Sequence, residues 1–322
     1  MSEFSLIEKY FSELGKQRSD VLLGVGDDAA VVNTPTSQSL AISVDTLIAG
    51  VHFPQSTKPY DIGWKSLAVN LSDMAAMAAK PCWATLALSL PDINDDWLRA
   101  FSRGFSDLAA LHNVQLVGGD TTRSPLSITV QIIGSFKYNK VLRRDRAVVG
   151  DGIYVTGWLG EAALGLKSMT ENLPLAHSEI ERLRLALNRP KPRVDEMLKL
   201  SSYINAAIDI SDGLAADLSH IVQASQVAAN VDVSLLPVSE RYARCNQGVQ
   251  FYDLALCGGD DYQLCFTVAK NNEKKLCQEA EKFPMRCTKI GEVVEGSGIR
   301  FRHGNKSYTI QQTPYDHFIR EN

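Results

Sequence analysis

Residues 126–160 read LSITVQIIGSFKYNKVLRRDRAVVGDGIYVTGWLG, and this stretch decides how the chain divides. Its apolar first part predicts a strand over 126–136, and the charged part that follows ends in a Gly-Asp pair that is typical of a boundary. The segment IYVTGWLG at 153–160 then predicts a new strand, a glycine-rich turn and the start of a helix. We therefore expect a first domain over residues 1–137, a linker over 138–150 and a second domain over 151–322.

Strand and helix patterns mix on both sides of this linker. In the first domain they predict helices over 4–14, 60–79 and 94–112 and strands over 40–48, 83–90 and 126–136, with a further strand ending at the glycine pair 118–119. In the second domain they predict strands over 206–210, 230–236, 261–269 and 287–294 and helices over 178–187, 193–202, 212–225 and 271–282. The fold class is therefore α/β, with α+β layers. The pattern leaves the direction of the strands open.

Length and composition agree with two globular domains and exclude several classes of partner. The 322 residues suggest two domains at about 150 residues each. The formal net charge is −4, so no basic surplus is present to neutralise a nucleic acid or an anionic membrane. Neither a secretory signal pattern nor an apolar run of about 18 residues is seen. We expect a cytoplasmic protein whose six cysteines are reduced thiols.

Aspartates recur in short motifs that are otherwise apolar or glycine-rich. They are Asp27 and Asp28 in GVGDDAAVV, Asp45 in SVDT, Asp73 in NLSDMAAM, Asp120 in VGGDTTR, Asp209 and Asp212 in AIDISDGLAADL, and Asp260 and Asp261 in LCGGDDYQL. A carboxylate in apolar surroundings is costly unless it is paired or bound to metal, and these segments contain almost no Lys or Arg. Hard cations such as Mg²⁺ take oxygen ligands of this kind and bridge them to phosphates. The glycines would let backbone N–H groups approach phosphate oxygens.

Each motif taken alone can also be accounted for by local structure. Asp212 precedes Gly213 and a helix and could cap it, while Asp261 could pin a turn. Asp73 is harder to account for in this way, because Asp inside a helix is a poor helix former. Six such motifs on different elements favour a binding site over six separate turns.

Two other segments carry basic residues that could meet a phosphate. The segment GEAALGLKS at 160–168 resembles a P-loop, but Leu166 separates the second glycine from Lys167, so we expect only the start of a helix. The arginines of the linker, Arg143, Arg144 and Arg146, either face solvent or reach a nucleotide phosphate through their planar donors.

The motifs GVGDDAAV, SVDTLIAGVHF, AVNLSDMAAM, GGDTTR, IDISDGLAADL and GGDDYQLCFTV, in this order, resemble those of the thiamine-monophosphate kinase family. The likeness runs from about residue 3 to residue 269 and resumes at YDHF, 315–318. The wider group includes aminoimidazole ribonucleotide synthetase and selenophosphate synthetase. The resemblance implies two α/β domains of the aminoimidazole ribonucleotide synthetase-like fold and a homodimer in which the N-terminal domains pair through strands. It also implies ATP-dependent phosphorylation of thiamine monophosphate to thiamine diphosphate.

The same resemblance implies roles for individual residues. Several Mg²⁺ ions would be held by Asp27, Asp28, Ser43, Asp45, Asp73, Asp120, Asp209 and Asp212. Of these, Asp45, Asp73 and Asp212 are expected to be catalytic. ATP would contact Gly119, Asp120, Arg144 and Ser211, and thiamine monophosphate would contact His52, Asp260 and Tyr315. Position 260 is Asp where the family usually has Glu, Val44 replaces a frequent Thr, and Gln311 to Pro314 precede Tyr315 where the family often has Trp.

The expected chemistry is in-line transfer of the γ-phosphoryl group of ATP to a phosphate oxygen. The acceptor is already ionised near neutral pH, so no strong general base is needed, and Mg²⁺ ions would screen the two polyanions. Three alternatives stay open at this point. They are a sister ATP-dependent synthetase, a Mg²⁺-dependent phosphohydrolase and a non-catalytic nucleotide-binding dimer.

Overall fold

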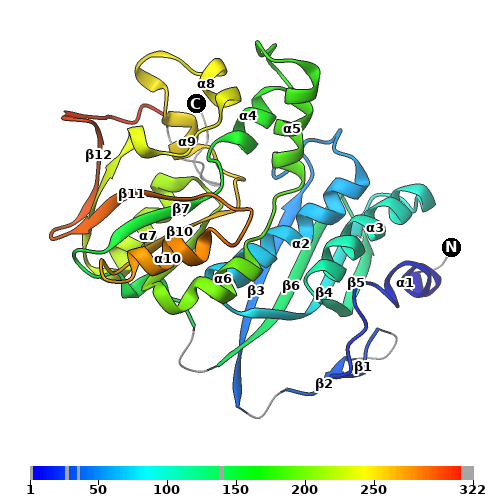
Figure 1. Cartoon of the computed structure of the whole chain (residues 1–322). Helices are drawn as coiled ribbons and strands as arrows, with labels where there is room; N and C mark the ends of the chain where they lie inside the picture. Colours follow the sequence, from blue (N-terminus) through cyan, green and yellow to red (C-terminus); the bar gives the residue numbers. More distant parts are fainter. Residues whose placement is uncertain (1–2, 26–28, 35–36, 138–140, 313–322) are drawn as a thin grey trace. The chain divides into compact units, whose positions relative to one another are not determined.

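A computed structural model describes residues 3–25, 29–34, 37–137 and 141–312 (Figure 1). The chain forms two compact units, of which the first comprises Met1–Met74 with Ala78–Val141 and the second Ala75–Met77 with Leu142–Asn322. Of the linker expected over 138–150, residues 138–140 lie outside the described residues. From Leu142 onward the chain clusters with the second unit.

The first unit is built on a four-stranded sheet in the order β3-β6-β4-β5. Its elements are α1 (Glu3–Phe11), β1 (Val21–Leu23), β2 (Val31–Val32), β3 (Gln38–Ile48), α2 (Pro59–Ala76), β4 (Lys80–Leu90), α3 (Asp95–Leu111), β5 (Gln115–Arg123) and β6 (Ser127–Lys137). Strand β6 is antiparallel to both β3 and β4, whereas β4 and β5 are parallel. The helices and strands predicted for this half are confirmed within a few residues, including Asn94 as the N-cap of α3. The exception is β5, which was predicted to end at the glycine pair 118–119 but continues to Arg123, so Asp120 lies within the strand.

The two faces of this sheet differ in what covers them. Ile128, Val130 and Ile132 of β6 are fully buried on the face that α2 and α3 cover (Figure 1). On the other face, Ile42 and Val44 of β3 are 62% and 57% exposed. Strands have a period of two, so these residues share one side of the sheet. The first unit therefore presents a bare apolar surface beside β3.

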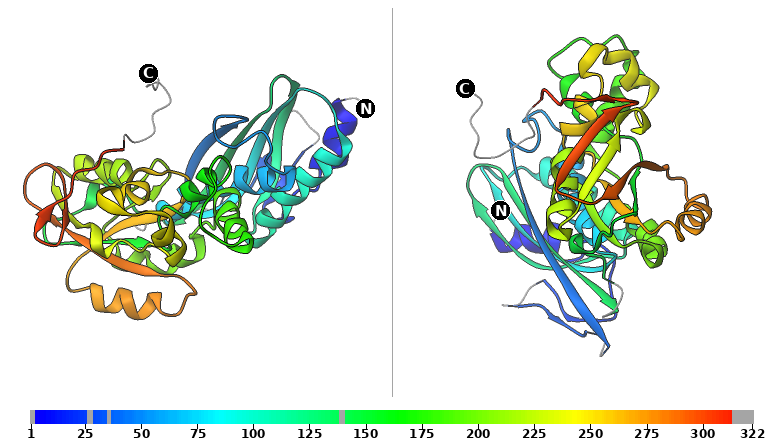
Figure 2. Two further views of the ribbon diagram at one scale, coloured as in Figure 1. Left: turned by 90° about the horizontal axis from the view of Figure 1, so that it is seen from above. Right: turned by 90° about the vertical axis from the view of Figure 1, so that its left-hand side faces the viewer.

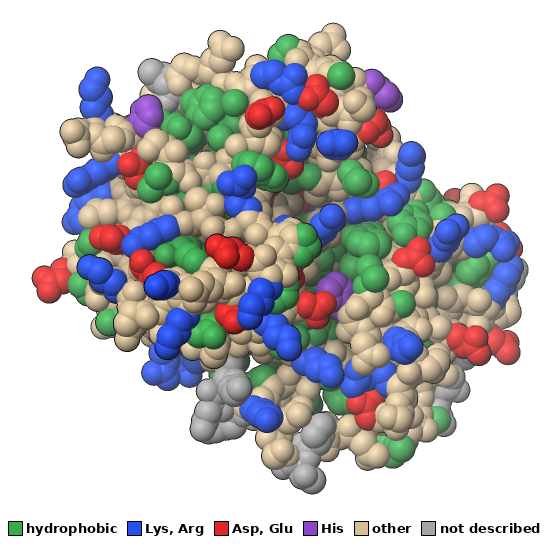
Figure 3. Space-filling model, viewed as in Figure 1, with side chains coloured by type: hydrophobic (Ala, Val, Ile, Leu, Met, Phe, Trp, Pro, Cys, Tyr) green, Lys and Arg blue, Asp and Glu red, His purple; other side chains and the backbone are tan. Residues whose placement is uncertain are grey.

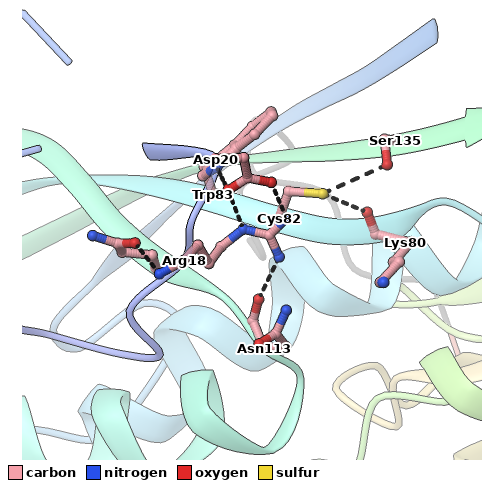
Figure 4. A network of polar contacts seen from close by, with 8 residues as sticks. Arg18, Asp20, Lys80, Cys82, Trp83, Asn113 and Ser135 are labelled. Carbon is pink, nitrogen blue, oxygen red and sulfur yellow. Dashed lines mark hydrogen bonds and ion pairs between the residues drawn. The ribbon is translucent and has the colours of Figure 1, made fainter. Parts of the chain in front are cut away.

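The segment before β1 covers one end of that second face through a polar network (Figure 4). Arg18 Nε donates to Asp20 Oδ1 at 2.8 Å, and the indole N–H of Trp83 donates to the same oxygen at 3.2 Å. Arg18 also donates to the carbonyl of Asn113 at 2.9 Å. Trp83 is 1% exposed and packs with residues of β1 and β2. These contacts fix the N-terminal segment on the sheet.

The second unit contains a seven-stranded sheet in the order β13-β12-β9-β11-β7-β10-β8. Its strands are β7 (Gly152–Thr156), β8 (Ala206–Ile210), β9 (Ala228–Asp232), β10 (Gln263–Val268), β11 (Cys287–Val294), β12 (Gly298–His303) and β13 (Lys306–Ser307). Its α-helices are α4 (Glu161–Lys167), α5 (His177–Asn188), α6 (Val194–Leu200), α7 (Leu214–Ser225), α8 (Glu240–Cys245), α9 (Asp253–Cys257) and α10 (Glu273–Ala280), and its 3₁₀ turns are η1 (Arg144–Arg146), η2 (Ser201–Tyr203), η3 (Val233–Leu235) and η4 (Gly248–Gln250). Among the described strands of this sheet, only the β9–β12 pair is parallel.

Helices cover both faces of the seven-stranded sheet. Ile221 of α7 lies in one buried cluster with Val155 of β7 and Ile208 of β8. The opposite face buries the stacked rings of Tyr154 and Phe266, whose centroids are 5.9 Å apart. Helix α10 lies on one side of the sheet in the left view of Figure 2. Among the described residues, no helix is both long and apolar enough to cross a membrane.

One predicted strand of this half is too long. The strand expected over 230–236 ends at Asp232, and Val233–Leu235 form the turn η3. The reason is local, since the Asp232 carboxylate accepts hydrogen bonds from the N–H and the hydroxyl of Ser234 at 3.0 and 2.6 Å. This side-chain cap competes with the strand ladder.

Strand direction sets where the acidic loops of this unit lie. Strand β10 is antiparallel to both β7 and β8. The segments after β7 and β8 and the segment before β10 therefore meet at one end of the sheet. This end, formed by residues 157–160, 211–213 and 257–262, is called the loop edge below.

Two glycines allow α2 and α3 to pack closely. A Cβ at Gly104 would lie 1.9 Å from the carbonyl oxygen of Tyr60, and one at Gly63 would lie 2.1 Å from that of Phe101. We expect Gly104→Ala to lower the free energy of unfolding by about 1–3 kcal/mol, because the backbone of α2 would have to move. Urea denaturation followed by fluorescence measures the change.

Gly24→Ala is the matched control, since its Cβ would meet nothing nearer than 3.7 Å. Equal stabilities of the two variants would contradict the close crossing.

Candidate functional site

In the first unit, β3 and α2 bring three of the predicted residues to one side of the sheet. The hydroxyl of Ser43 on β3 donates to Oδ2 of Asp73 on α2 at 2.5 Å. Asp45 is two residues beyond Ser43 and therefore points to the same face. Asp73 lies in the last turn of α2, where the helix dipole disfavours a negative charge. Helix stability therefore does not account for Asp73, in agreement with a binding role.

His52 follows β3 in a turn that fixes its ring. Its Nδ1 accepts a hydrogen bond from the backbone N–H of Ile48 at 3.0 Å. A neutral imidazole with Nδ1 as acceptor carries its proton on Nε2, which is then a hydrogen-bond donor. The buried side chain of Lys65 donates to the carbonyl of His52 at 3.2 Å. The turn thus fixes the orientation of the imidazole ring.

Asp120 is exposed and belongs to β5 at the far edge of the same sheet. Its carboxylate makes no hydrogen bond or ion pair within the described part of the chain. A Cβ at the preceding Gly119 would lie 1.9 Å from the carbonyl oxygen of Leu86, so only glycine fits there. In register, Asp120 pairs with the exposed Ala87, whereas Asp45 pairs with the buried Val130. One copy of this unit therefore places Asp45 and Asp120 on opposite faces of its sheet.

In the second unit, β8 carries Asp209, and Ser211 and Asp212 follow this strand in the loop edge. Asp209 is 5% exposed, and Asp212 is exposed. The carboxylate of Asp212 makes no hydrogen bond within the described residues, and α7 has no side-chain cap at Gly213. The alternative reading of Asp212, that it caps this helix, is therefore wrong.

The residue that holds this turn is Asp217, which the sequence reasoning missed. Its Oδ2 accepts hydrogen bonds from the N–H groups of Ser211, Asp212 and Gly213 at 3.0, 3.1 and 3.1 Å. Burial, with Asp209 and Asp212 nearby, raises the pKa of Asp217 to about 8. These N–H groups are engaged, so the expectation that the glycine turn leaves them for phosphate does not hold at this loop. An acidic residue in the first helical turn, DGLAAD, was the available signal.

In the second acidic loop, the neighbouring residues Asp260 and Asp261 make different contacts. Asp260 has φ +68° and is half-buried, and its N–H donates to the carbonyl of Ser211 at 2.9 Å. Asp261 is 6% exposed and accepts hydrogen bonds from the N–H groups of Gly160 and Ala162 at 2.7 and 3.4 Å. The alternative that Asp261 pins a turn is therefore confirmed. Asp260, in contrast, lies beside Ser211 at the loop edge.

The two basic segments differ in what engages them. Asp261 occupies the N–H groups at the start of α4, and Lys167 in its last turn pairs with Glu171 at 3.6 Å. The P-loop-like segment is thus a helix start, as predicted. In η1, Asp145 pairs with the flanking Arg143. The guanidinium of the exposed Arg144 makes no hydrogen bond or ion pair within the described residues.

Several of the predicted ligands lie outside what the structure describes, or in different units. Asp27, Asp28 and Tyr315 fall outside the described residues. Within the described residues, no three side chains of His, Cys, Asp or Glu gather closely enough to hold a metal. Mg²⁺ usually takes one or two carboxylates and completes its shell with water and phosphate oxygens. Carboxylate and hydroxyl oxygens, such as those of the Ser43–Asp73 pair in the first unit and of Asp212 in the second, are donors of the kind that Mg²⁺ accepts.

Charge is not segregated on the visible surface. On the face shown in Figure 3, basic and acidic side chains are interspersed.

The Arg193 guanidinium lies partly buried near the loop edge, where its Nε donates to Oε1 of Gln263 at 2.9 Å. Burial lowers the pKa of Arg193. Sequence reasoning missed this residue too, because nothing in the motif around it marks it.

Asp261 gives the stability of the fold a pH dependence. Burial raises its pKa from an ordinary 3.8 to about 8, so the native state holds a proton that the unfolded chain releases. The free energy of unfolding should therefore fall as the pH rises between these two values. Urea unfolding at pH 5.5 and 8.5 should show a smaller fall for Asp261→Asn than for the wild type.

Asp95→Asn is the control, because the hydrogen bond from Lys9 lowers the pKa of that carboxyl and its contribution is lost only in acid. Identical pH profiles for Asp261→Asn and the wild type would contradict a proton on Asp261.

Known proteins resemble the chain over nearly its whole length. Residues 26–136 match the AIR synthase related protein N-terminal domain, and residues 148–304 match the corresponding C-terminal domain. The thiamine-monophosphate kinase of Escherichia coli K12 is 44% identical over 98% of both chains. The crystal structure of the thiamine-monophosphate kinase from Stenotrophomonas maltophilia K279a is 48% identical, with a TM-score of 0.84 over 88% of this chain and 92% of that one.

A further solved structure, AaThiL complexed with AMPPCP and TMP, is 31% identical, with a TM-score of 0.77 over 91% of this chain and 92% of that chain. The two-domain fold, the order of the acidic motifs and these likenesses agree with one another. The chain belongs to the thiamine-monophosphate kinase family of the AIR synthase related proteins.

Proposed function

We propose that this protein transfers the γ-phosphoryl group of ATP to thiamine monophosphate. A P–O bond forms to a phosphate oxygen of the acceptor, the bond to the β-phosphate breaks, and the products are ADP and thiamine diphosphate. One observation carries the proposal, which is the 44% identity to a thiamine-monophosphate kinase over 98% of both chains. Six free cysteines suit a reducing cytosol, and we propose that compartment.

Two of the carboxylates support this chemistry because they are exposed and make no hydrogen bond within the described residues. Asp120 and Asp212 are exposed, and neither carboxylate is used by the described fold. We propose that they bind ATP through Mg²⁺ together with Ser43, Asp45, Asp73 and Asp209, and with Asp27 and Asp28. Mg²⁺ would neutralise charge that develops on the transferring phosphoryl group. Gly119 would allow close approach of the nucleotide, while Ser211 and Arg144 would donate to its phosphates.

The acceptor needs orientation more than activation. The second pKa of a phosphate monoester is about 6, so the attacking oxygen is already ionised at neutral pH. The Nε2–H of His52 would then donate to that phosphate and hold it in line. We propose that Asp260 contacts the thiamine part, with Tyr315 as the covering residue. Asp260 has φ +68°, and its N–H is held by the carbonyl of Ser211.

We further propose that two copies pair through the first unit. The bare face beside β3 carries Ile42 and Val44 in register with Ile133 and Gln131 of β6. Exposed apolar side chains in a row favour burial against a matching surface. Asp120 points to this same face from β5, at the opposite edge of the sheet.

An assay separates the candidate functions. Purified protein is incubated with ATP, Mg²⁺ and thiamine monophosphate, and the products are separated by chromatography. Thiamine diphosphate with equimolar ADP supports the proposal. ADP without thiamine diphosphate would indicate a phosphohydrolase or a sister synthetase, and no ADP at all would indicate a nucleotide-binding protein without catalysis.

The acidic residues can be tested in the same assay. We expect Asp45→Asn and Asp212→Asn each to lower kcat by on the order of a hundredfold or more, because each removes charge stabilisation made in the transition state. Asp195→Asn changes an exposed aspartate of α6 outside the motifs and serves as the control. Near-normal turnover of either motif variant at saturating Mg²⁺ would contradict the assigned roles.

The dimer surface is tested by charge. Ile42→Asp places a carboxylate among the exposed apolar side chains of β3, and we expect it to shift the protein from dimer to monomer in sedimentation velocity experiments. Leu111→Asp is the matched control, because Leu111 is 69% exposed at the end of α3 and not on this face. A monomeric wild type, or an unchanged dimer in Ile42→Asp, would refute this surface.

A further inference from the structure

A single buried oxygen organises the loop edge of the second unit. Asp217 is 3% exposed, and its Oδ2 accepts from three consecutive N–H groups, those of Ser211, Asp212 and Gly213. The three distances lie between 3.0 and 3.1 Å, so the hydrogen bonds are of similar quality. Three donors that converge on one acceptor curl the backbone around it and fix its dihedral angles.

This curl turns the side chain of Asp212 outward. Asp212 is exposed although its own N–H points inward to Asp217. Gly213 has φ +117°, and a Cβ there would lie 2.9 Å from the backbone of Cys257. The turn therefore has one conformation in which Asp217 is bonded, Gly213 packs against α9 and the Asp212 carboxylate faces solvent.

The same turn carries the loop that precedes β10. The N–H of Asp260 donates to the carbonyl of Ser211 at 2.9 Å, and the N–H of Tyr262 donates to that of Ile210 at 2.8 Å. A Cβ at Gly259 would lie 2.4 Å from the Ser211 oxygen, so the two backbones are in direct contact. A displacement of 211–213 would therefore be passed on to Asp260.

We infer that Asp217 is a positioning residue for phosphoryl transfer, and this inference rests on the proposed function. By binding the backbone of the turn, Asp217 positions the Ser211 hydroxyl and the Asp212 carboxylate for the nucleotide. Through the Ser211 carbonyl, which accepts from the Asp260 N–H, it also positions Asp260 for the acceptor. The N–H groups of the turn are engaged by Asp217, so this loop meets phosphate through side chains and Mg²⁺ and not through its backbone. Geometric errors near 1 Å at such a site cost large factors in rate.

Two competing roles for Asp217 would give different results on mutation. If Asp217 only stabilised α7 through the helix dipole, its loss would lower stability and leave metal binding unchanged. If Asp217 were itself a metal ligand, the neutral amide of Asn would damage the site as much as Ala does. A positioning residue requires an acceptor oxygen in this place, which Asn supplies and Ala does not.

The experiment compares Asp217→Ala, Asp217→Asn and Asp151→Ala with the wild type. Asp151 is the matched control because it is 3% exposed and accepts from the Val148 N–H and the Asn205 amide at the opposite end of β7. Mn²⁺ binding is measured by electron paramagnetic resonance in the presence of AMPPCP. Amide hydrogen exchange is followed over residues 211–213, and turnover is measured with thiamine monophosphate.

In Asp217→Ala we expect faster exchange at 211–213, Mn²⁺ affinity reduced at least tenfold and kcat reduced at least a hundredfold. In Asp217→Asn, Mn²⁺ affinity and exchange should stay within about threefold of the wild type. Asp151→Ala should lose stability and keep wild-type Mn²⁺ affinity.

Wild-type Mn²⁺ affinity and exchange in Asp217→Ala would overturn the inference, and so would equal damage in Asp217→Asn and Asp217→Ala. Exchange and Mn²⁺ binding need no thiamine monophosphate. They therefore decide on Asp217 even if the wild type makes no thiamine diphosphate, a result that would contradict only the proposed function.

Discussion

Hydrogen bonds from backbone N–H groups to buried carboxylates hold the loop edge of the second unit. Asp217 binds the turn after β8, and Asp261 binds the start of α4 after β7. A loop that must leave its functional side chains exposed cannot fix itself by burying them. Here a neighbouring aspartate takes over that task, because a buried N–H group that lost its acceptor oxygen would be left unsatisfied, which is costly. The exposure of Asp212 and the position of Asp260 both depend on this arrangement.

Aspartate thus has two opposite uses in one short stretch of structure. Asp217 and Asp261 are buried and accept backbone hydrogen bonds, whereas Asp212 is exposed and its carboxylate is not engaged by the described fold. Burial beside other carboxylates raises the pKa of each buried member to about 8, which is the cost of using an acid as a structural acceptor. Asp209 and Asp212 both interact electrostatically with Asp217, and a cation would offset the charge of the exposed Asp212.

The sequence predicts the helices and strands well. It predicts poorly which aspartates are buried hydrogen-bond acceptors and which are exposed. The strand over 206–210 and the helix from 95 to 111 follow from local pattern and capping, which act over a few residues. The adjacent Asp260 and Asp261 have the same local signal, and only the tertiary contact with Gly160 separates them. Asp217 likewise acts on residues before its own helix. The strand over 230–236 was predicted too long because the Asp232 side chain accepts a hydrogen bond from the Ser234 N–H, which ends the strand. The alternation of apolar residues does not reveal such a cap.

The first unit raises a different constraint, which is the alternation of side chains along a strand. Ser43, Asp45 and Asp73 meet on the face that α2 covers, whereas the register sends Asp120 to the bare face with Ala87. The motifs GGDT and SVDT are both acidic, and the family resemblance assigns Asp120 and Asp45 alike to Mg²⁺ binding. Because side chains alternate between the two faces along each strand, Asp45 and Asp120 lie on opposite faces of the sheet within one copy. If both aspartates serve one reaction centre, a second copy has to supply a group to the face that carries Asp120. The exposed Ile42 and Val44, on β3 at the other edge of this face, are the side chains that such a copy would cover.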